Sequence, residues 1–282
     1  MDVDLAYDRC EAITKVEARN FSYGIRLLPD DKRRAMSALY AFARRVDDVG
    51  DGTLPAKEKH DALEAVRDRV RRLVDGPADE DDEIAIALGD SMKRFPIDPD
   101  ELLEVVDGCE MDCKTTAYAT FDELATYCRL VAGSIGRLSL SIFGSNDADA
   151  PGLANTLGLG LQVTNILRDI VEDRDVMGRV YLPGEDLARF SCSPDVSGDP
   201  EHLSELLRFE AGRARAFYAE GLGLLDLLDR RSRACVAAMS GIYLRLLLRI
   251  EARPLAVLER RVSLPSWEKA WVAMRSLAGA SA

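Results

Sequence analysis

Amphipathic helical periodicity runs through almost all of this chain of 282 residues, and alternating strand patterns are nearly absent. Segment 29–49 shows the pattern clearly, with an apolar stripe at Met36, Leu39, Ala43 and Val46. A capping box of Thr120 with Glu123 opens another helix. Further helical signals cover 57–76, 82–95, 98–109, 120–144, 151–176, 200–228, 232–252 and 265–278. We therefore predict a single all-α domain over residues 1–282, a bundle of about ten helices.

Two of the predicted helices carry acidic residues one turn apart on a single face. The first face spans an arc of about 60° and consists of Tyr40, Arg44, Asp47 and Asp51. The second spans about 80°, within a segment rich in Leu, Ile and Val, and consists of Gln162, Asn165, Asp169 and Asp173. Neither helix is polar enough to be exposed to solvent all round.

Carboxylates on such apolar helices indicate a cation. Burying a carboxylate among aliphatic side chains is costly unless a cation or a hydrogen-bond donor accepts it. Mg²⁺ prefers oxygen ligands and is commonly shared between carboxylates and substrate phosphates. The alternative for either motif alone is a solvated helix face, but the presence of two similar motifs favours a magnesium site that holds a diphosphate.

Composition excludes several other classes of protein. The net charge of −12 disfavours nucleic acid as a partner. The chain has only two histidines, His60 and His202, which argues against a catalytic triad and leaves Cys109 and Cys113 short of ligands for zinc. Neither a secretory signal nor an apolar run of about 18 residues is apparent. We expect a cytoplasmic protein with reduced thiols, in peripheral contact with the inner face of a membrane at most.

Small residues gather in segments 131–136 and 157–161. They indicate close helix packing, a channel for a long apolar ligand, or both. Near the C-terminus, Trp267 and Trp271 lie one turn apart. Packing in the core is the favoured role for this pair, and contact with a membrane surface is the alternative.

Three segments in this order resemble the squalene/phytoene synthase family, whose members join prenyl diphosphates head to head and have the all-α isoprenoid synthase fold. The segments are NFSYGIRLLPDDKRRAMSALYAFARRVDDVGD, YCRLVAGSIG and LGLGLQVTNILRDIVEDRDVMGRVYLP. The resemblance is clear from about residue 19 to residue 182 and weaker beyond. It implies a central cavity within the helical bundle.

The resemblance assigns roles to individual residues. It implies that the metal ligands are Asp47, Asp51, Asn165, Asp169 and Asp173. It places around the reacting carbons and the diphosphates Tyr40, Arg44, Tyr127, Gln162, Arg168, Tyr181 and Tyr243. For Tyr181 and Tyr243, a buried tyrosine of the core is an equal alternative.

The N-terminal phosphate-binding segment departs from the family pattern. Relatives often have Ser, Arg or Lys, Ser and Phe there, whereas this chain has Ala18, Arg19, Asn20 and Phe21. Arg19 keeps the positive charge and Asn20 keeps a hydrogen-bonding group, but both hydroxyls are absent. Arg19, Asn20 and Phe21 therefore remain expected substrate-binding residues with altered phosphate contacts.

The segments most resemble bacterial hopanoid-pathway enzymes, so the expected reaction joins two molecules of farnesyl diphosphate to presqualene diphosphate with Mg²⁺. NADPH is not expected for this first half-reaction. The alternatives are a phytoene synthase that uses geranylgeranyl diphosphate, a full squalene synthase, and a catalytically silent helical assembly protein. The sequence leaves the oligomeric state open.

Overall fold

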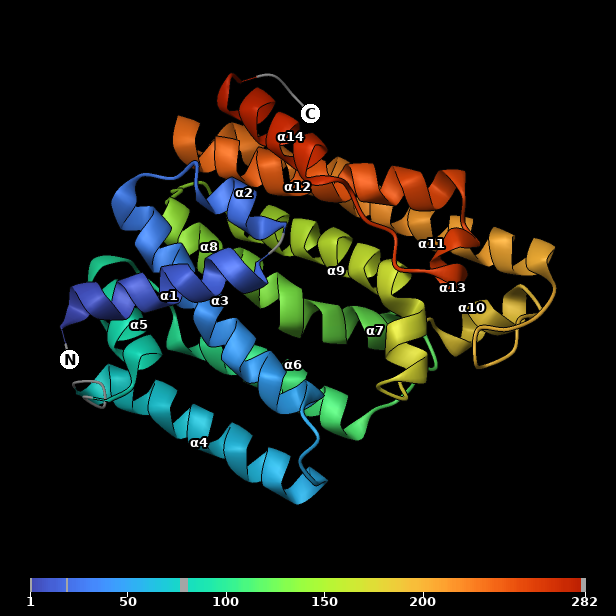
Figure 1. Ribbon diagram of the computed structural model, residues 1–282, viewed down its shortest axis with the longest axis horizontal. Coiled ribbons are helices and arrows are strands. Elements are labelled where there is room, and N and C mark those ends of the chain that lie inside the picture. Colours follow the sequence, from blue (N-terminus) through green and yellow to red (C-terminus); the bar gives the residue numbers. More distant parts are fainter. Residues whose placement is uncertain (1, 19, 77–80, 280–282) are drawn as a thin grey trace.

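The computed structural model describes residues 2–18, 20–76 and 81–279, and within these ranges it is built of helices (Figure 1). The only strand-like feature described is an isolated bridge between Ala117 and Val180. The all-α prediction is confirmed. The helices are α1 (Val3–Glu17), α2 (Phe21–Ile25), α3 (Asp30–Asp51), α4 (Ala56–Asp75), α5 (Glu83–Arg94), α6 (Pro99–Lys114), α7 (Phe121–Cys128), α8 (Ser134–Phe143), α9 (Ala150–Asp175), α10 (Gly184–Arg189), α11 (Pro200–Gly221), α12 (Arg230–Ala252), α13 (Ala256–Glu259) and α14 (Ser266–Leu277).

Aspartate side chains begin several of these helices. The carboxylates of Asp82, Asp98 and Asp229 accept hydrogen bonds from backbone N–H groups in the first turn of α5, α6 and α12. Such a cap satisfies donors that have no partner inside the helix and suits its positive end. The long helices from α3 onward were predicted from their periodicity, whereas α1, which is 15 residues long, was not predicted. The short helices α2, α10 and α13, which lie in connecting segments, account for most of the difference from the expected number.

The predicted helix over 120–144 is interrupted in the middle. A π-helical turn, η1 (Arg129–Gly133), joins α7 to α8. At the start of α7, Thr120 Oγ1 accepts a hydrogen bond from the backbone N–H of Glu123 at 3.3 Å, as a capping box requires. The Glu123 carboxylate instead accepts from the N–H of Ala119 at 2.8 Å, so only half of the predicted box forms.

Helix α9 lies in the middle of the bundle, where it packs against α8, η1, α11, α12 and α13 (Figure 1). A Cβ atom at Gly158 would lie 2.5 Å from the backbone oxygen of Ala132, and one at Gly221 would lie 2.6 Å from the backbone nitrogen of Leu157. Glycine at these two positions therefore lets backbone approach backbone. These contacts support the packing interpretation of the small-residue segments.

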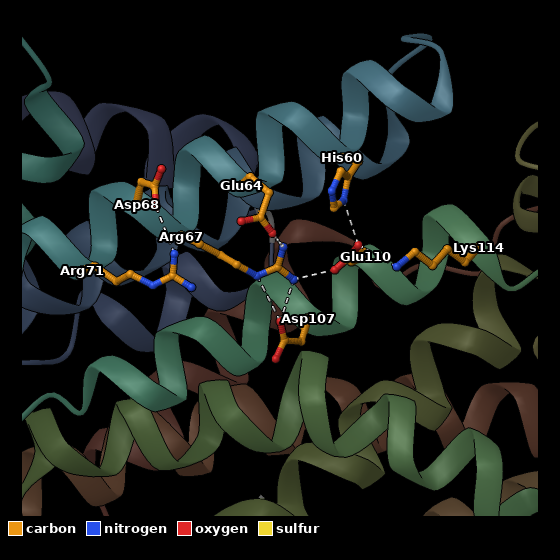
Figure 2. A network of polar contacts seen from close by, with 8 residues as sticks. All are labelled: His60, Glu64, Arg67, Asp68, Arg71, Asp107, Glu110 and Lys114. Atoms are coloured by element: carbon orange, nitrogen blue, oxygen red, sulfur yellow. Dashed lines mark hydrogen bonds and ion pairs between the residues drawn. The ribbon is translucent and has the colours of Figure 1, made fainter.

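An ion-pair network joins α4 to α6 at the side of the bundle (Figure 2). Arg67, whose side chain is buried, donates to Asp107 and Glu110 on α6, each at 2.6 Å, and to Glu64 on its own helix at 2.7 Å. His60 and Lys114 add contacts to Glu110, whose pKa is lowered to about 2 chiefly by the bond from Lys114. This network fixes α6, the helix that contributes Asp112 to the site described below.

Helices α12 and α14 lie together on the outside of the bundle (Figure 1). Glu268 on α14 is buried and pairs with Arg245 and Arg249 on α12. Trp271 packs against the hydrophobic core, but Trp267 is 71% exposed. The prediction that both tryptophans pack in the core is wrong for Trp267. The two positions lie about 40° apart on the helix, and the edge of the buried face falls between them, so only Trp271 turns inward. None of the described helices is long and apolar enough to cross a membrane.

Candidate active site

The first acidic motif lies on the C-terminal half of α3. Asp47 is accessible to solvent, yet the surrounding protein desolvates it and, with help from the neighbouring charge of Asp51, raises its pKa to about 7. A side chain that is both accessible and strongly desolvated faces a recess within the protein rather than the outer surface. Arg44, one turn earlier, forms an ion pair with Asp48 at 2.7 Å.

The second acidic motif lies on the C-terminal half of α9. Asp173 is half-buried, and desolvation together with the charge of Asp169 raises its pKa to about 7. Asp169 is held by Arg168 at 2.8 Å and by Arg261 at 2.9 Å. Arg261 also reaches Glu172 at 3.3 Å. Two guanidinium groups thus neutralise Asp169, while Asp173 has no such partner among the described residues.

Asp112 on α6 lies between the two motifs. Its carboxylate accepts hydrogen bonds from the hydroxyls of Tyr127 at 2.8 Å and Tyr181 at 2.7 Å. Burial raises the pKa of Asp112, and its charge in turn raises the pKa of both Asp47 and Asp173. Asp112 therefore contributes to the electrostatics of acids on both α3 and α9.

Arg179 connects the same groups from the segment after α9. Its buried guanidinium donates to Asp51 at 3.0 Å and to the carbonyl oxygen of Gly50 at 3.1 Å, and it lies 4.0 Å from Asp112. Its charge also lowers the pKa of Asp173. Arg179 is therefore the basic group that holds the end of α3 against the second motif.

Aromatic side chains cover the same region. Tyr127 and Tyr181 stack with ring centroids 5.2 Å apart. Phe21 on α2 stacks on Tyr243 of α12 at 5.3 Å, and the guanidinium of Arg168 lies 6.0 Å from the Tyr243 ring. Burial raises the pKa of Tyr40 to about 12, so its hydroxyl stays protonated at neutral pH.

The remaining predicted residues lie as follows. Gln162 and Asn165 are half-buried on α9, where the Asn165 amide donates to Gln162 Oε1 at 3.4 Å. Asn20 stands at the start of α2 without capping it. Arg19 lies outside the described residues.

A small pocket opens beside the second motif. Asp173, Arg179 and Tyr181 supply its polar atoms, and aliphatic side chains form the rest of its wall: Ile166, Ile170, Val180, Leu182 and Val196. The pocket thus combines charged groups with an apolar wall. Such a wall can hold an anionic head group while an apolar chain lies beside it.

The chemistry of the donor set fits magnesium. Asn165 Oδ1 is buried and has no hydrogen-bond partner, and the raised pKa values of Asp47 and Asp173 are those of carboxylates without a sufficient counter-charge. Among the residues described, no group of three or more His, Cys, Asp or Glu side chains is close enough to ligate an ion alone. Mg²⁺ tolerates this, because it commonly takes one or two carboxylates and completes its shell with water and phosphate oxygens.

A family model described as squalene/phytoene synthase matches residues 14–268. The chain belongs to the squalene/phytoene synthase family. It is 47% identical to a protein named phytoene synthase from Mycobacterium tuberculosis (strain ATCC 25618 / H37Rv), over 98% of this chain and 92% of that protein. It is 33% identical to a 15-cis-phytoene synthase from Synechococcus elongatus, over 94% of this chain and 90% of that protein.

Solved structures of the family have the same fold. A dehydrosqualene synthase in complex with ligand aligns with a TM-score of 0.86 and 25% identity, over 98% of this chain and 97% of that chain. The squalene synthase HpnC from Alicyclobacillus acidocaldarius aligns with a TM-score of 0.82 and 27% identity, over 89% of this chain and 95% of that chain. The predicted family and the isoprenoid synthase type of fold are confirmed.

Three residues of this region were not predicted from the sequence: Asp112, Arg179 and Arg261. Arg179 could have been found, since it stands two residues before Tyr181 and side chains at that spacing in an extended segment share a side. Asp112 and Arg261 lie far along the chain from the two motifs, and no local pattern marks either of them.

Proposed function

We propose that this enzyme joins two molecules of geranylgeranyl diphosphate head to head and releases diphosphate, and that phytoene is the product. The convergence of the two acidic motifs on Asp112 and Arg179 supports a prenyl diphosphate as substrate. The choice of geranylgeranyl over the expected farnesyl diphosphate rests on the relative named phytoene synthase, 47% identical over nearly the whole chain.

In this proposal, the acids and arginines hold the leaving diphosphate. Asp47, Asp51, Asn165, Asp169 and Asp173 would hold Mg²⁺, which stabilises the negative charge that develops as the allylic C–O bond breaks. Beyond this ligand set, Arg168, Arg179 and Arg261 would bind diphosphate oxygens, since each is already paired with a carboxylate of the set. Arg44, which pairs with Asp48 next to Asp47, would bind a further diphosphate oxygen.

The aromatic residues would guide the carbon skeleton. An allylic cation reacts with water unless an apolar surface surrounds it, and aromatic faces stabilise positive charge. Phe21 and Tyr243 form one such surface, and Tyr127 with Tyr181 forms another. Tyr40 would remain neutral near the reacting carbons, because its raised pKa excludes the phenolate.

Farnesyl diphosphate is the second candidate substrate. The structural neighbours named dehydrosqualene synthase and squalene synthase HpnC favour it, at 25% and 27% identity. Presqualene diphosphate would then be the first product, and conversion to squalene would need NADPH.

Product analysis separates these candidates. Purified protein is incubated with Mg²⁺ and either geranylgeranyl or farnesyl diphosphate, with and without NADPH, and the extract is analysed by mass spectrometry. We expect a C40 hydrocarbon from geranylgeranyl diphosphate and at most trace product from farnesyl diphosphate. A C30 product would establish farnesyl diphosphate as the substrate. If neither substrate were consumed, the result would favour the catalytically silent assembly protein.

A further inference from the structure

Positive charge is concentrated at the C-terminal end of this acidic chain. Residues 230–282 carry ten Arg and Lys side chains and three Glu side chains, a net charge of +7, although the whole chain carries −12. The described part of this segment forms α12, α13 and α14. An asymmetry of this size indicates a surface that meets an anionic partner.

Large apolar side chains are exposed on the same helices. Trp267 is 71% exposed and Met274 65%, and both lie within about 20° of each other around α14. Leu248 on α12 is 47% exposed. A tryptophan with most of its surface in water is an unfavourable arrangement unless the indole meets a partner.

The charged groups lie next to these apolar side chains. Arg249 is exposed and reaches Ser263 and Glu268, so it lies beside the start of α14, where Trp267 stands. The guanidinium groups of Arg245 and Arg275 lie 4.6 and 4.7 Å from the ring of Trp271, one turn from Trp267. Arg253 and Arg260 are exposed along the connection from α12 to α14 and have no ion pair with any described residue.

We propose that this α12–α14 surface, made of Leu248, Arg249, Arg253, Arg260, Trp267 and Met274, docks the enzyme on a bilayer that contains anionic lipids. Arginines at its edge would meet the lipid phosphates, while Trp267 and Met274 would enter the interface between head groups and acyl chains. The negative charge elsewhere opposes binding only weakly, because charges more than about 8 Å from the membrane are screened at physiological salt. Helix α14 stays folded on the protein during docking, because buried Glu268 ties it to α12.

The proposal stands apart from the catalysed reaction and is tested without substrate. The chain has only two tryptophans, exposed Trp267 and Trp271 in the core, so its indole fluorescence comes from α14 alone. The full-length protein is mixed with vesicles of phosphatidylcholine, or of phosphatidylcholine with phosphatidylglycerol. Binding is measured by co-sedimentation, and insertion is measured by fluorescence quenching with lipids brominated on the acyl chains.

We expect binding to the anionic vesicles that weakens with salt, together with quenching that Trp267→Phe largely removes. The double variant Arg253→Glu, Arg260→Glu should bind at least about tenfold more weakly, since each arginine near a charged membrane contributes about fivefold. Two control variants change exposed residues on other helices. The double variant Lys57→Glu, Arg208→Glu makes the same change in net charge, and Val16→Ser removes an exposed apolar side chain. These should bind within about twofold of the wild type.

Three results would overturn the proposal: no binding to anionic vesicles at low salt, equal binding to neutral vesicles, or an equal loss in the control variants. A dimer in solution that Trp267→Ser dissociates would also overturn it, because a second copy of the chain would then cover the surface. Circular dichroism of each variant confirms that a loss of binding does not come from unfolding.

Discussion

Asp112 is the residue on which the geometry of the candidate site depends most. It accepts hydrogen bonds from two tyrosine hydroxyls and lies near Arg179, while its charge acts on acids of both motifs. A carboxylate with these partners fixes the direction of both tyrosines. Its charge also adds to desolvation, the main cause, in raising the pKa of Asp47 and Asp173.

We therefore predict that Asp112→Asn lowers kcat by about 10- to 100-fold, which corresponds to about 1–3 kcal/mol for a charged hydrogen-bond acceptor. The pH profile should also change, because removal of this charge lowers the pKa of Asp47 and Asp173. The acidic limb of the kcat profile would then move to lower pH. Steady-state kinetics across pH measures both effects.

The control for this prediction is Asp100→Asn, the same substitution on the exposed first turn of α6. It should leave kcat and the pH profile unchanged. If Asp112→Asn lowered the melting temperature strongly but left the position of the acidic limb unchanged, its role would be structural only.

The sequence shows the one-turn spacing of the acids on α3 and α9, but it does not show the residues that contact them. Asp47, Asp51, Asp169 and Asp173 follow a one-turn spacing that can be read along a single helix. Asp112 depends on how α6 packs against α3 and η1, which is tertiary information. Likewise, Arg261 reaches Asp169 across 92 positions of sequence, and no periodicity links residues so far apart.

At the scale of elements, the position of α9 depends on contacts between backbones. Gly158 lies against the backbone of Ala132 in η1, and Gly221 at the end of α11 lies against Leu157. A π-helical turn bulges the chain locally, and here that turn is the surface on which α9 rests. The helix that carries the second acidic motif is thus positioned by main-chain atoms, which cannot change rotamer.

We predict that Gly158→Ala destabilises the protein by about 1–3 kcal/mol, because the added Cβ would meet backbone atoms of Ala132 at 2.5 and 2.8 Å. Activity should fall further than stability, since a shift of α9 moves Asp169 and Asp173. Chemical denaturation and kinetics measure the two effects. Gly152→Ala on the same helix, where a Cβ meets nothing within 4 Å, should be neutral or stabilising. Equal effects of the two substitutions would contradict the packing argument.

Element boundaries show where sequence patterns stop being informative. The long helices from α3 onward follow from apolar periodicity and aspartate caps, both of which are local signals. The π-helical turn within 120–144 was missed, because it packs against α9 and against α6, where Gly108 lies close to Val131, and no local pattern shows this packing. The exposure of Trp267 was missed for a similar reason: a pattern of two tryptophans does not show which one faces the core.

At the scale of the whole molecule, the unpaired acids make stability depend on pH and on metal. Desolvation raises the folded-state pKa of Asp47 and Asp173 from 3.8 to about 7. Between about pH 4 and pH 7 these two carboxyl groups therefore bind more protons in the folded protein than in the unfolded chain, and their contribution to stability falls as pH rises. Glu210, whose pKa burial raises to about 8, acts in the same direction.

We predict that the melting temperature of the metal-free protein falls between about pH 5 and pH 8, and that Mg²⁺ with inorganic diphosphate largely restores it. Asp47→Asn and Asp173→Asn should each raise the metal-free melting temperature at pH 8 by about 2–4 °C, equivalent to about 1 kcal/mol after solvent screening. Scanning calorimetry with chelator and with metal measures this. A melting temperature that rose with pH in chelator would contradict the assigned carboxylate environment.

The main-chain contacts of α9 also determine which part of the site can lose conformational entropy when a ligand binds. Amide protons in the middle of that helix should be among the slowest to exchange with deuterium, before any ligand binds. One wall of the site is thus preorganised, and little disorder remains there for a ligand to remove. Binding of a diphosphate should then order mainly the other acidic helix end, where α3 ends at Asp51 and residues 52–55 lead to α4.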